Sequence, residues 1–230
     1  MKLSVIIPTL NEATFIRRLV DYLFSNARGT QLEVLVIDGG SKDETVLIAG
    51  ETEAKVFVSP KASRAAQMNF GASLATGKIL YFVHADTLPP SSFAADIQKY
   101  IDEGFSLGRY RTKFDSRHWL LKLNAFFTRF DWFICYGGDQ TLFITWQLFK
   151  EVGGYNEQLQ IMEEYEFVAR AREKGRYKIM QKDALVSARK YDHNSWWQVQ
   201  LANYRVVQMY KNGSSQEEIV QRYNELTRLP

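Results

Sequence analysis

Acidic side chains follow three of the apolar runs in the first half of the sequence. Glu12 comes after the run 3–7, Asp38 closes the run LEVLVID, and Asp86 follows ILYFV in the stretch ILYFVHADTLPP at residues 79–90. Carboxylates can bind a divalent cation or accept hydrogen bonds from a base or a ribose, and they also form turns. The surrounding sequence has to decide between these roles.

A second group of acids lies in the run MEEYEF at residues 162–167. Clustered carboxylates repel one another, which raises the pKa of at least one of them towards a value useful to a general base. The same run also fits the first turn of a helix, where the helix dipole favours acids. Both interpretations stay open, because Glu163 and Glu166 lie one turn apart while Glu164 points elsewhere.

Alternating strand and helix signals indicate how the first group of acids comes together. Short runs rich in Val, Ile and Leu predict strands at 3–7, 32–37, 55–58 and 79–83, and the intervening spacing predicts helices at 16–23 and 62–75. Strands joined by helices form right-handed crossovers and a largely parallel sheet. Ligands bind at the carboxyl edge of such a sheet, which is where these acids would lie.

The pattern loosens after Pro90 but still predicts one compact domain. It indicates helices at 91–102 and 119–133, strands at 105–114 and 141–145, and two closing helices at 196–211 and 215–226. Ser215 and Glu218 form a capping box that opens the last helix. We expect an α/β fold with a mainly parallel, Rossmann-like sheet flanked by helices and a helical C-terminal tail.

Composition narrows the class of protein. The chain has 230 residues, 46% of them hydrophobic, and a net charge of +3 that does not by itself argue for a nucleic-acid partner. A single cysteine, Cys135, fits a reducing compartment, and the broken apolar run at the amino terminus does not resemble a signal peptide. We predict no membrane-spanning helix and a cytoplasmic location.

Neither loop that follows the first two strands carries a known phosphate-binding motif. The loops read PTLNE and DGGSKDET, which match neither G-x-G-x-x-G nor G-x-x-x-x-G-K-[ST]. Dehydrogenases and P-loop kinases are therefore excluded. Gly39 and Gly40 would let a ligand approach the backbone closely, so Asp38 is either a ligand contact or a turn former.

Five segments together resemble glycosyltransferase family two, whose members have the GT-A fold and use nucleotide-activated sugars. They are SVIIPTLNE at 4–12, VIDGGSKDET at 36–45, SRAAQMNFGASLATGKILYFVHADTLPP at 63–90, GGDQTLFITWQLFKEVGGYNE at 137–157 and MEEYEF at 162–167. Their order along the chain is that of the family. The combination RAAQMN, HADT, GGDQ and MEEYE is most similar to the small bacterial subgroup named for arsenosugar biosynthesis.

The resemblance implies a role for each group of residues. Donor-binding positions would be Pro8, Thr9, Glu12, Asp38, Gly39, Arg64 and Asp139, with Asp38 on the uracil or other base and Arg64 near the base or diphosphate. Asp86 would bind the Mg²⁺ or Mn²⁺ that bridges the donor diphosphate. His84 stands in the first acidic position of that motif, so it would ligate Mn²⁺, bond a phosphate or satisfy backbone groups.

The same resemblance implies the catalytic residues and the division of the chain. Glu164 would be the general base, with Glu163 beside it, and Arg189 resembles a late basic residue that could meet the diphosphate. Residues 1–90 would bind the nucleotide-sugar, 91–190 would provide the acceptor and catalytic half, and 191–230 would form the tail. The implied reaction is inverting, metal-dependent and hexosyltransferase-like, from a donor such as a UDP-sugar to an acceptor hydroxyl.

Other functions and partners remain open from the sequence. A nucleotidyltransferase would share the acids and the metal, and a non-catalytic nucleotide-sugar-binding protein would tolerate His84 and Glu164. The segment 109–129 has six basic residues and one acid, which suits a membrane surface at its cytoplasmic face, an anionic lipid-linked acceptor or simply an amphipathic helix packed on the sheet. Nucleic acid is not expected, because no nucleic-acid module accompanies the charge.

Overall fold

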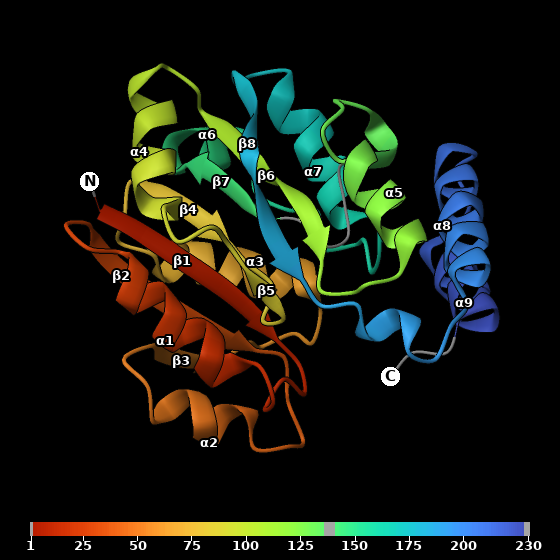
Figure 1. Ribbon diagram of the computed structural model, residues 1–230, viewed down its shortest axis with the longest axis horizontal. Coiled ribbons are helices and arrows are strands. Elements are labelled where there is room, and N and C mark those ends of the chain that lie inside the picture. Colours follow the sequence, from red (N-terminus) through yellow and green to blue (C-terminus); the bar gives the residue numbers. More distant parts are fainter. Residues whose placement is uncertain (1, 136–140, 228–230) are drawn as a thin grey trace.

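The first half of the chain forms a parallel sheet. The structure is a computed structural model that describes residues 2–135 and 141–227 (Figure 1). Its first four strands are mutually parallel in the order β3-β2-β1-β4: β1 (Lys2–Thr9), β2 (Gln31–Asp38), β3 (Lys55–Val58) and β4 (Ile79–Phe82). The connecting helices are α1 (Ile16–Asn26), α2 (Thr45–Gly50) and α3 (Arg64–Leu74).

The second half extends the same sheet with strands that run in both directions. The full strand order is β3-β2-β1-β4-β7-β6-β8-β5, with β5 (Thr87–Leu88), β6 (Leu107–Phe114), β7 (Leu142–Thr145) and β8 (Tyr177–Val186). Strand β7 runs antiparallel to β4 and β6, and β5 is antiparallel to β8, whereas β6 and β8 are parallel. Among the described residues, parallel pairs outnumber antiparallel pairs by four to three, and the expected α/β fold is confirmed.

Helices cover both faces of the sheet, and the tail lies to one side (Figure 1). The second half contributes α4 (Phe93–Asp102), α5 (Trp119–Phe127), α6 (Trp146–Glu151) and α7 (Glu163–Arg172). Short 3-10 turns occur at η1 (Phe133–Cys135) and η2 (Arg189–Tyr191), and the tail consists of α8 (Trp196–Lys211) and α9 (Gln216–Leu226). Capping boxes open both tail helices, at Ser195 and at Ser215, which confirms the one predicted from the sequence.

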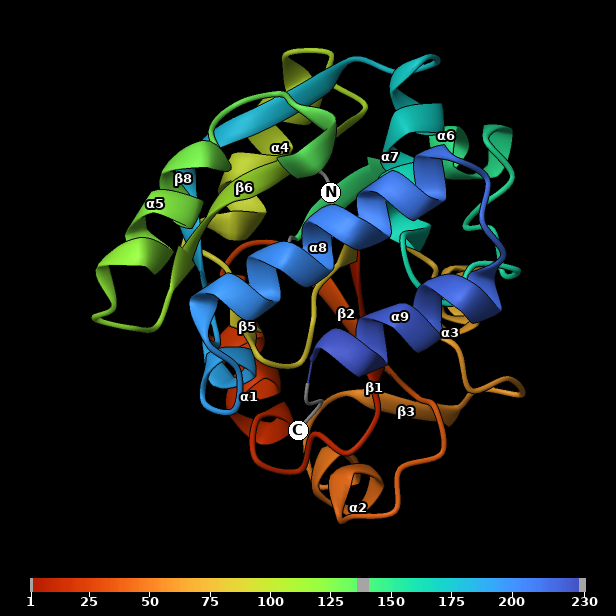
Figure 2. The same cartoon turned by 90° about the vertical axis from the view of Figure 1, so that its right-hand side faces the viewer.

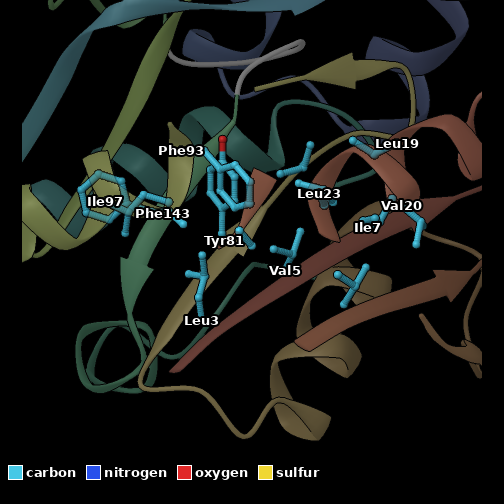
Figure 3. Packing of buried hydrophobic residues seen from close by; sticks show 14 of the residues in the cluster. Leu3, Val5, Ile7, Leu19, Val20, Leu23, Tyr81, Phe93, Ile97 and Phe143 are labelled. Atoms are coloured by element: carbon cyan, nitrogen blue, oxygen red, sulfur yellow. The ribbon is translucent and has the colours of Figure 1, made fainter. Parts of the chain in front are cut away.

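Alternation along β1 divides the core into two layers. Leu3, Val5 and Ile7 pack with residues of α1 and α4, whereas Ile6 packs with residues of α3, because neighbouring strand residues point to opposite faces. Figure 3 shows the first layer, in which the ring of Tyr81 stacks on Phe93 with 5.9 Å between their centroids. The strands are thus packed on both faces, and this core positions the carboxyl edge of the sheet.

The second half differs from its predicted elements. The helix expected at 119–133 ends at Phe127, because the buried guanidinium of Arg109 takes the carbonyl groups that follow it, donating to the Thr128 oxygen at 2.7 Å and to the Phe130 oxygen at 3.4 Å. Arg109 therefore lies inside the protein, and counting it in a basic surface was wrong. Strand β8 and the short helices α2 and α6 were not predicted.

Candidate active site

The ends of β1 and β2 hold Asp38 in a dense network of hydrogen bonds. One carboxylate oxygen accepts the N–H groups of Gly40 and Ser41, both at 2.8 Å, and the other accepts the hydroxyl groups of Thr9 at 3.3 Å and of Ser41. A carboxylate has about four good acceptor positions, and these four donors fill them. The turn-forming role of Asp38 is therefore observed, and Gly40 allows it by its φ of 94°.

The side chain of Gln67 bonds the same strand ends, and sequence reasoning missed this residue. Its side-chain N–H₂ group donates to the carbonyl oxygens of Thr9 at 2.8 Å and Ile37 at 2.7 Å. Ser63 caps the start of α3 by accepting the Ala66 N–H, which positions Gln67 one turn later. The signal in the sequence was a glutamine within the mostly apolar run at 65–68. The side chain of Gln67 is buried, and a buried amide must find hydrogen-bond partners.

Arg189 connects two of the predicted site residues. Its guanidinium donates to both oxygens of Glu12, once at 2.8 Å, and its Nε lies 3.2 Å from a carboxylate oxygen of Asp86. The Cζ atom of Arg189 lies 5.0 Å from the centroid of the Phe15 ring, which packs against the guanidinium. The residues are separated by up to 177 positions, but β8 returns the chain to this edge of the sheet and brings η2 against the first loop.

The two polar side chains of the HAD tripeptide have different partners. While Asp86 lies near Arg189, His84 Nε2 lies 2.8 Å from Glu164 Oε1 at the start of α7. Burial alone would lower the pKa of His84, but the charge of Glu164 and their hydrogen bond outweigh it and raise that pKa. His84 is thus held by the predicted base rather than by backbone groups.

Glu163 is the more deeply buried of the two predicted catalytic acids. Burial raises its pKa, which the nearby charge of Arg64 partly opposes and the charge of Glu164 reinforces. The guanidinium of Arg64 lies 3.4 Å from the Glu163 carboxylate and belongs to α3. The pair therefore links the predicted donor side of the site with the predicted catalytic side.

An uncommon backbone conformation precedes these acids. Met162 has a φ of 71°, a left-handed conformation that costs a non-glycine residue of the order of 1 kcal/mol or more. Its side chain is buried against Val206 and Val207 of α8 and Ile219 of α9. Packing by the tail offsets the strain, so α8 and α9 help to fix the direction in which α7 presents Glu163 and Glu164.

A cavity opens beside Asp86 at this edge of the sheet. It has a volume of about 250 Å³, and Phe15, Asp86, Asp115 and Arg189 are among the residues that line it. In the part of the chain that the structure describes, no three His, Cys, Asp or Glu side chains cluster as a ready-made metal centre. The donor set still fits a hard cation, because Mg²⁺ and Mn²⁺ can be bound by one or two carboxylates together with phosphate oxygens and waters.

The predicted site residues thus form two neighbouring groups. Glu12, Asp86 and Arg189 make up the first, and His84, Glu164, Glu163 and Arg64 the second. Pro8, Thr9, Asp38 and Gly39 lie at the adjoining ends of β1 and β2. Asp139 lies outside the described residues, as do the neighbouring glycines of its predicted segment.

Comparison with known proteins identifies the family. The profile of Glycosyl transferase family 2 matches residues 4–156, about two thirds of the chain. The chain belongs to this family. A PGL/p-HBAD biosynthesis glycosyltransferase of Mycobacterium tuberculosis is 28% identical over 184 residues, which cover 71% of this chain and 67% of the relative. An uncharacterized glycosyltransferase of Rickettsia felis is 32% identical over 109 residues, covering 47% of this chain and 37% of the relative.

Solved structures show the same fold. S. aureus TarS 1–349 superposes with a TM-score of 0.67 at 17% identity, covering 98% of this chain and 70% of that one. The mannosyltransferase PcManGT from Pyrobaculum calidifontis, solved with GDP-Man and Mn²⁺, superposes with a TM-score of 0.68 at 17% identity, covering 97% and 69%. The GT-A fold expected from the sequence is therefore confirmed.

The helices of the structure are short or polar compared with membrane spans. Among residues 2–135 and 141–227, none has both the length and the apolar character needed to cross a bilayer.

Proposed function

We propose that this glycosyltransferase is an inverting enzyme that moves a sugar from a nucleotide-sugar to an acceptor hydroxyl, with Glu164 as the general base. The observation that carries this proposal is the contact of 2.8 Å between Glu164 and His84, two residues from Asp86. The contact brings a candidate base next to the turn that carries Asp86, the carboxylate proposed to hold the metal ion of the donor diphosphate. Nucleophile activation and leaving-group departure need this proximity.

The chemical step needs one proton transfer and one displacement. The acceptor O–H gives its proton to Glu164 as its oxygen attacks the anomeric carbon, and the bond from that carbon to the diphosphate oxygen breaks on the opposite face. No covalent glycosyl-enzyme is required. His84 is a positioning residue in this scheme, because its contact of 2.8 Å with one oxygen of Glu164 holds that carboxylate in place as it takes the proton.

Asp86 is the residue that would hold Mg²⁺ or Mn²⁺, with Glu12 as a second carboxylate nearby. A divalent cation there would supply Lewis-acid stabilisation of the charge that grows on the diphosphate. Since His84 is engaged with Glu164, we assign it to the base and not to the metal. Arg189 neutralises Glu12 and Asp86 in their present arrangement and can also meet phosphate oxygens.

The donor side of the site is proposed at the ends of β1 and β2. Pro8, Thr9 and Gly39 would border the nucleoside. Asp38 would contact the base only if one of its four hydrogen-bond donors gives way, so its first role is to shape the loop after β2. A UDP-sugar is favoured because S. aureus TarS has been solved with UDP and with UDP-GlcNAc, although PcManGT carries GDP-Man.

The relatives bear on the subgroup that the sequence resembles. The resemblance to the subgroup named for arsenosugar biosynthesis gains no support from the relatives, whose names concern PGL/p-HBAD biosynthesis. We therefore propose an acceptor hydroxyl without assigning the molecule to that subgroup. Asp139, expected on the donor side, keeps that role as a proposal.

Replacement of Asp86 by alanine tests the metal assignment. We expect Asp86→Ala to abolish the gain in UDP affinity that Mn²⁺ gives the wild type while leaving thermal unfolding near that of the wild type, because the side chain lies at the sheet edge. Titration calorimetry with UDP, with and without Mn²⁺, measures this directly. Asp115→Ala is the matched control, since Asp115 lines the same cavity. Among the described residues, Arg189 forms an ion pair with Asp86 and not with Asp115. If Mn²⁺ increases the UDP affinity of Asp86→Ala as much as that of the wild type, the metal is bound at another site.

Product analysis distinguishes the proposed reaction from nucleotidyl transfer. Sugar transfer releases a nucleoside diphosphate, whereas nucleotidyl transfer releases pyrophosphate. A protein that binds the donor and gives neither product with any hydroxyl acceptor, nor by slow hydrolysis, would be a binding protein and would contradict the proposal.

A further inference from the structure

Helices α5 and α8 both turn apolar side chains towards solvent. The exposed residues recur at the same spacing in both helices, i, i+4 and i+7, which places them on one face of each: Trp119, Leu123 and Phe126 on α5, and Trp197, Leu201 and Tyr204 on α8. Trp119 is 68% exposed and Trp197 is 72% exposed. Together we call these six residues the aromatic face.

The aromatic face is not the side on which the helices pack. Val199, Ala202 and Val206 bury the inner side of α8, so this helix is apolar on two opposite sides. A helix with that pattern normally has protein or lipid on both. Large aromatic side chains gathered on a surface in this way mark an interaction site more often than an ordinary surface.

The two chain segments that carry the aromatic face hold charges of one sign only. Residues 116–130 and 193–216 contain no Asp or Glu, while they carry the exposed basic residues Arg117, Lys122, Arg129, Arg205 and Lys211. Acids occur only beyond these segments, and one of them, Asp131, is already paired with Arg172. Trp, Tyr and Phe combined with Lys and Arg on the surface of a helix suit the interface of an anionic bilayer.

The two helices lie beside each other, so their faces can serve one surface. The indole N–H of Trp196 on α8 donates to the side chain of Asn124 on α5 at 3.3 Å. Figure 1 shows both helices on the side of the molecule away from β1–β3, and Figure 2, which looks at that side, shows α8 across the front and α5 at its left. We propose that the aromatic face of α5 and α8 docks on an anionic lipid bilayer, with the tryptophan rings at the level of the headgroups.

This docking would orient the catalytic acids with respect to the membrane. The inner side of α8 holds Met162, the residue directly before Glu163 and Glu164, so one helix separates the aromatic face from the start of α7. An acceptor hydroxyl on a lipid would then approach the base from a fixed side. This consequence for the acceptor rests on the proposed function, whereas docking itself does not.

Vesicle binding tests the docking independently of catalysis. The full chain is sedimented with vesicles of phosphatidylcholine alone and with vesicles of equal parts phosphatidylcholine and phosphatidylglycerol, at low and high salt. We expect binding to the anionic vesicles that weakens with salt, and a blue shift of tryptophan fluorescence on binding. Absence of binding to either vesicle would overturn the proposal, whatever the enzyme does with its donor.

Paired variants locate the contact. Trp119→Ser with Trp197→Ser should reduce anionic-vesicle binding about tenfold or more, since each large apolar side chain contributes of the order of 1 kcal/mol or more at an interface. Both side chains are exposed, so thermal unfolding should not change. Trp146→Ser is the control, because Trp146 is also exposed but belongs to α6. Equal losses in the control and in the double variant would contradict the proposal.

Other occupants of the aromatic face give different results. If a second copy of the chain covers it, light scattering shows a dimer that the double variant abolishes, and vesicles are not bound. If nucleic acid covers it, a duplex competes with the anionic vesicles and binds more tightly than they do. Either result would replace lipid as the partner.

Discussion

Glu33 and Glu163 are both buried glutamates, yet their environments shift their pKa values in opposite directions. Glu33 lies early in β2, away from the site, where burial alone would raise its pKa. A hydrogen bond from the Thr76 N–H, with others from Ser4, Lys55 and the Thr76 hydroxyl, lowers it to about 2. Burial raises the pKa of Glu163, and the charge of Arg64 only partly compensates at 3.4 Å.

The difference separates a structural acid from the acids of the site. Glu33 ties the starts of β1 and β4 to β2 and is fully supplied with donors, so it has no capacity for a substrate. The start of α7 keeps two buried carboxylates next to each other, and burial together with the charge of Glu164 raises the pKa of Glu163. Such an arrangement costs stability and is commonly retained in active sites. The comparison predicts that substitutions at Glu33 change folding, whereas those at Glu164 change turnover.

The largest effect is expected for Glu164→Gln. Glutamine keeps the size of the side chain but cannot accept the acceptor proton, so turnover should fall by about 10²- to 10⁴-fold while donor affinity stays near that of the wild type. Steady-state rates with a UDP-sugar and calorimetry with UDP measure the two quantities. Thermal unfolding should change little in comparison.

Glu163→Gln is the internal control for this variant. It should reduce turnover less, because in our proposal Glu163 orients the site through Arg64. If Glu163→Gln proves inactive while Glu164→Gln remains active, the base has been assigned one residue too late. If both keep full turnover with an authentic acceptor, the acidic run is only the start of α7.

The next largest effect is expected on stability, for Glu33→Gln. Because the folded pKa of Glu33 is depressed from 4.5 to about 2, the charged form stabilises the fold above pH 4.5 and that contribution disappears as the pH falls towards 2. The loss in the variant should be about 2 to 3 kcal/mol at pH 7 and should narrow below about pH 5. Urea unfolding over this pH range measures it, and a difference that grows in acid would contradict the depressed pKa.

Sequence patterns predicted the first half better than the second for a physical reason. Strands β1 to β4 are continuous apolar runs joined by helices, and both features can be recognised locally. Strand β8 is interrupted by three polar residues at 181–183 and pairs with β6 and β5, so its identity depends on distant partners. The helix at 119–133 was predicted too long because the side chain that ends it, Arg109, comes from another strand.

The same contrast applies to the site. Glu12, Asp86 and Glu164 could be found because acids stand out after apolar runs and within a family motif, whereas the partner of each could not. Arg189 meets Glu12 across most of the chain, and His84 meets Glu164 across 80 residues, contacts that only the folded sheet brings about. Residue type and strand position therefore indicated the candidates, and tertiary structure was needed to pair them.

The smallest effect is expected for Arg189→Met, and it has opposite signs for two ligands. The guanidinium lies 3.2 Å from Asp86, so it competes with any cation at that carboxylate, and methionine should tighten binding of Mn²⁺ alone. The same change removes a positive charge that can meet the diphosphate, so UDP without metal should bind more weakly. Because the Arg189 side chain is one-third exposed, each change should be about fivefold, equivalent to roughly 1 kcal/mol. Calorimetry with each ligand measures both, and Arg189→Lys, which keeps the charge, should show smaller changes. Weaker binding of Mn²⁺ in Arg189→Met would mean that Arg189 supports the metal position instead of competing for it.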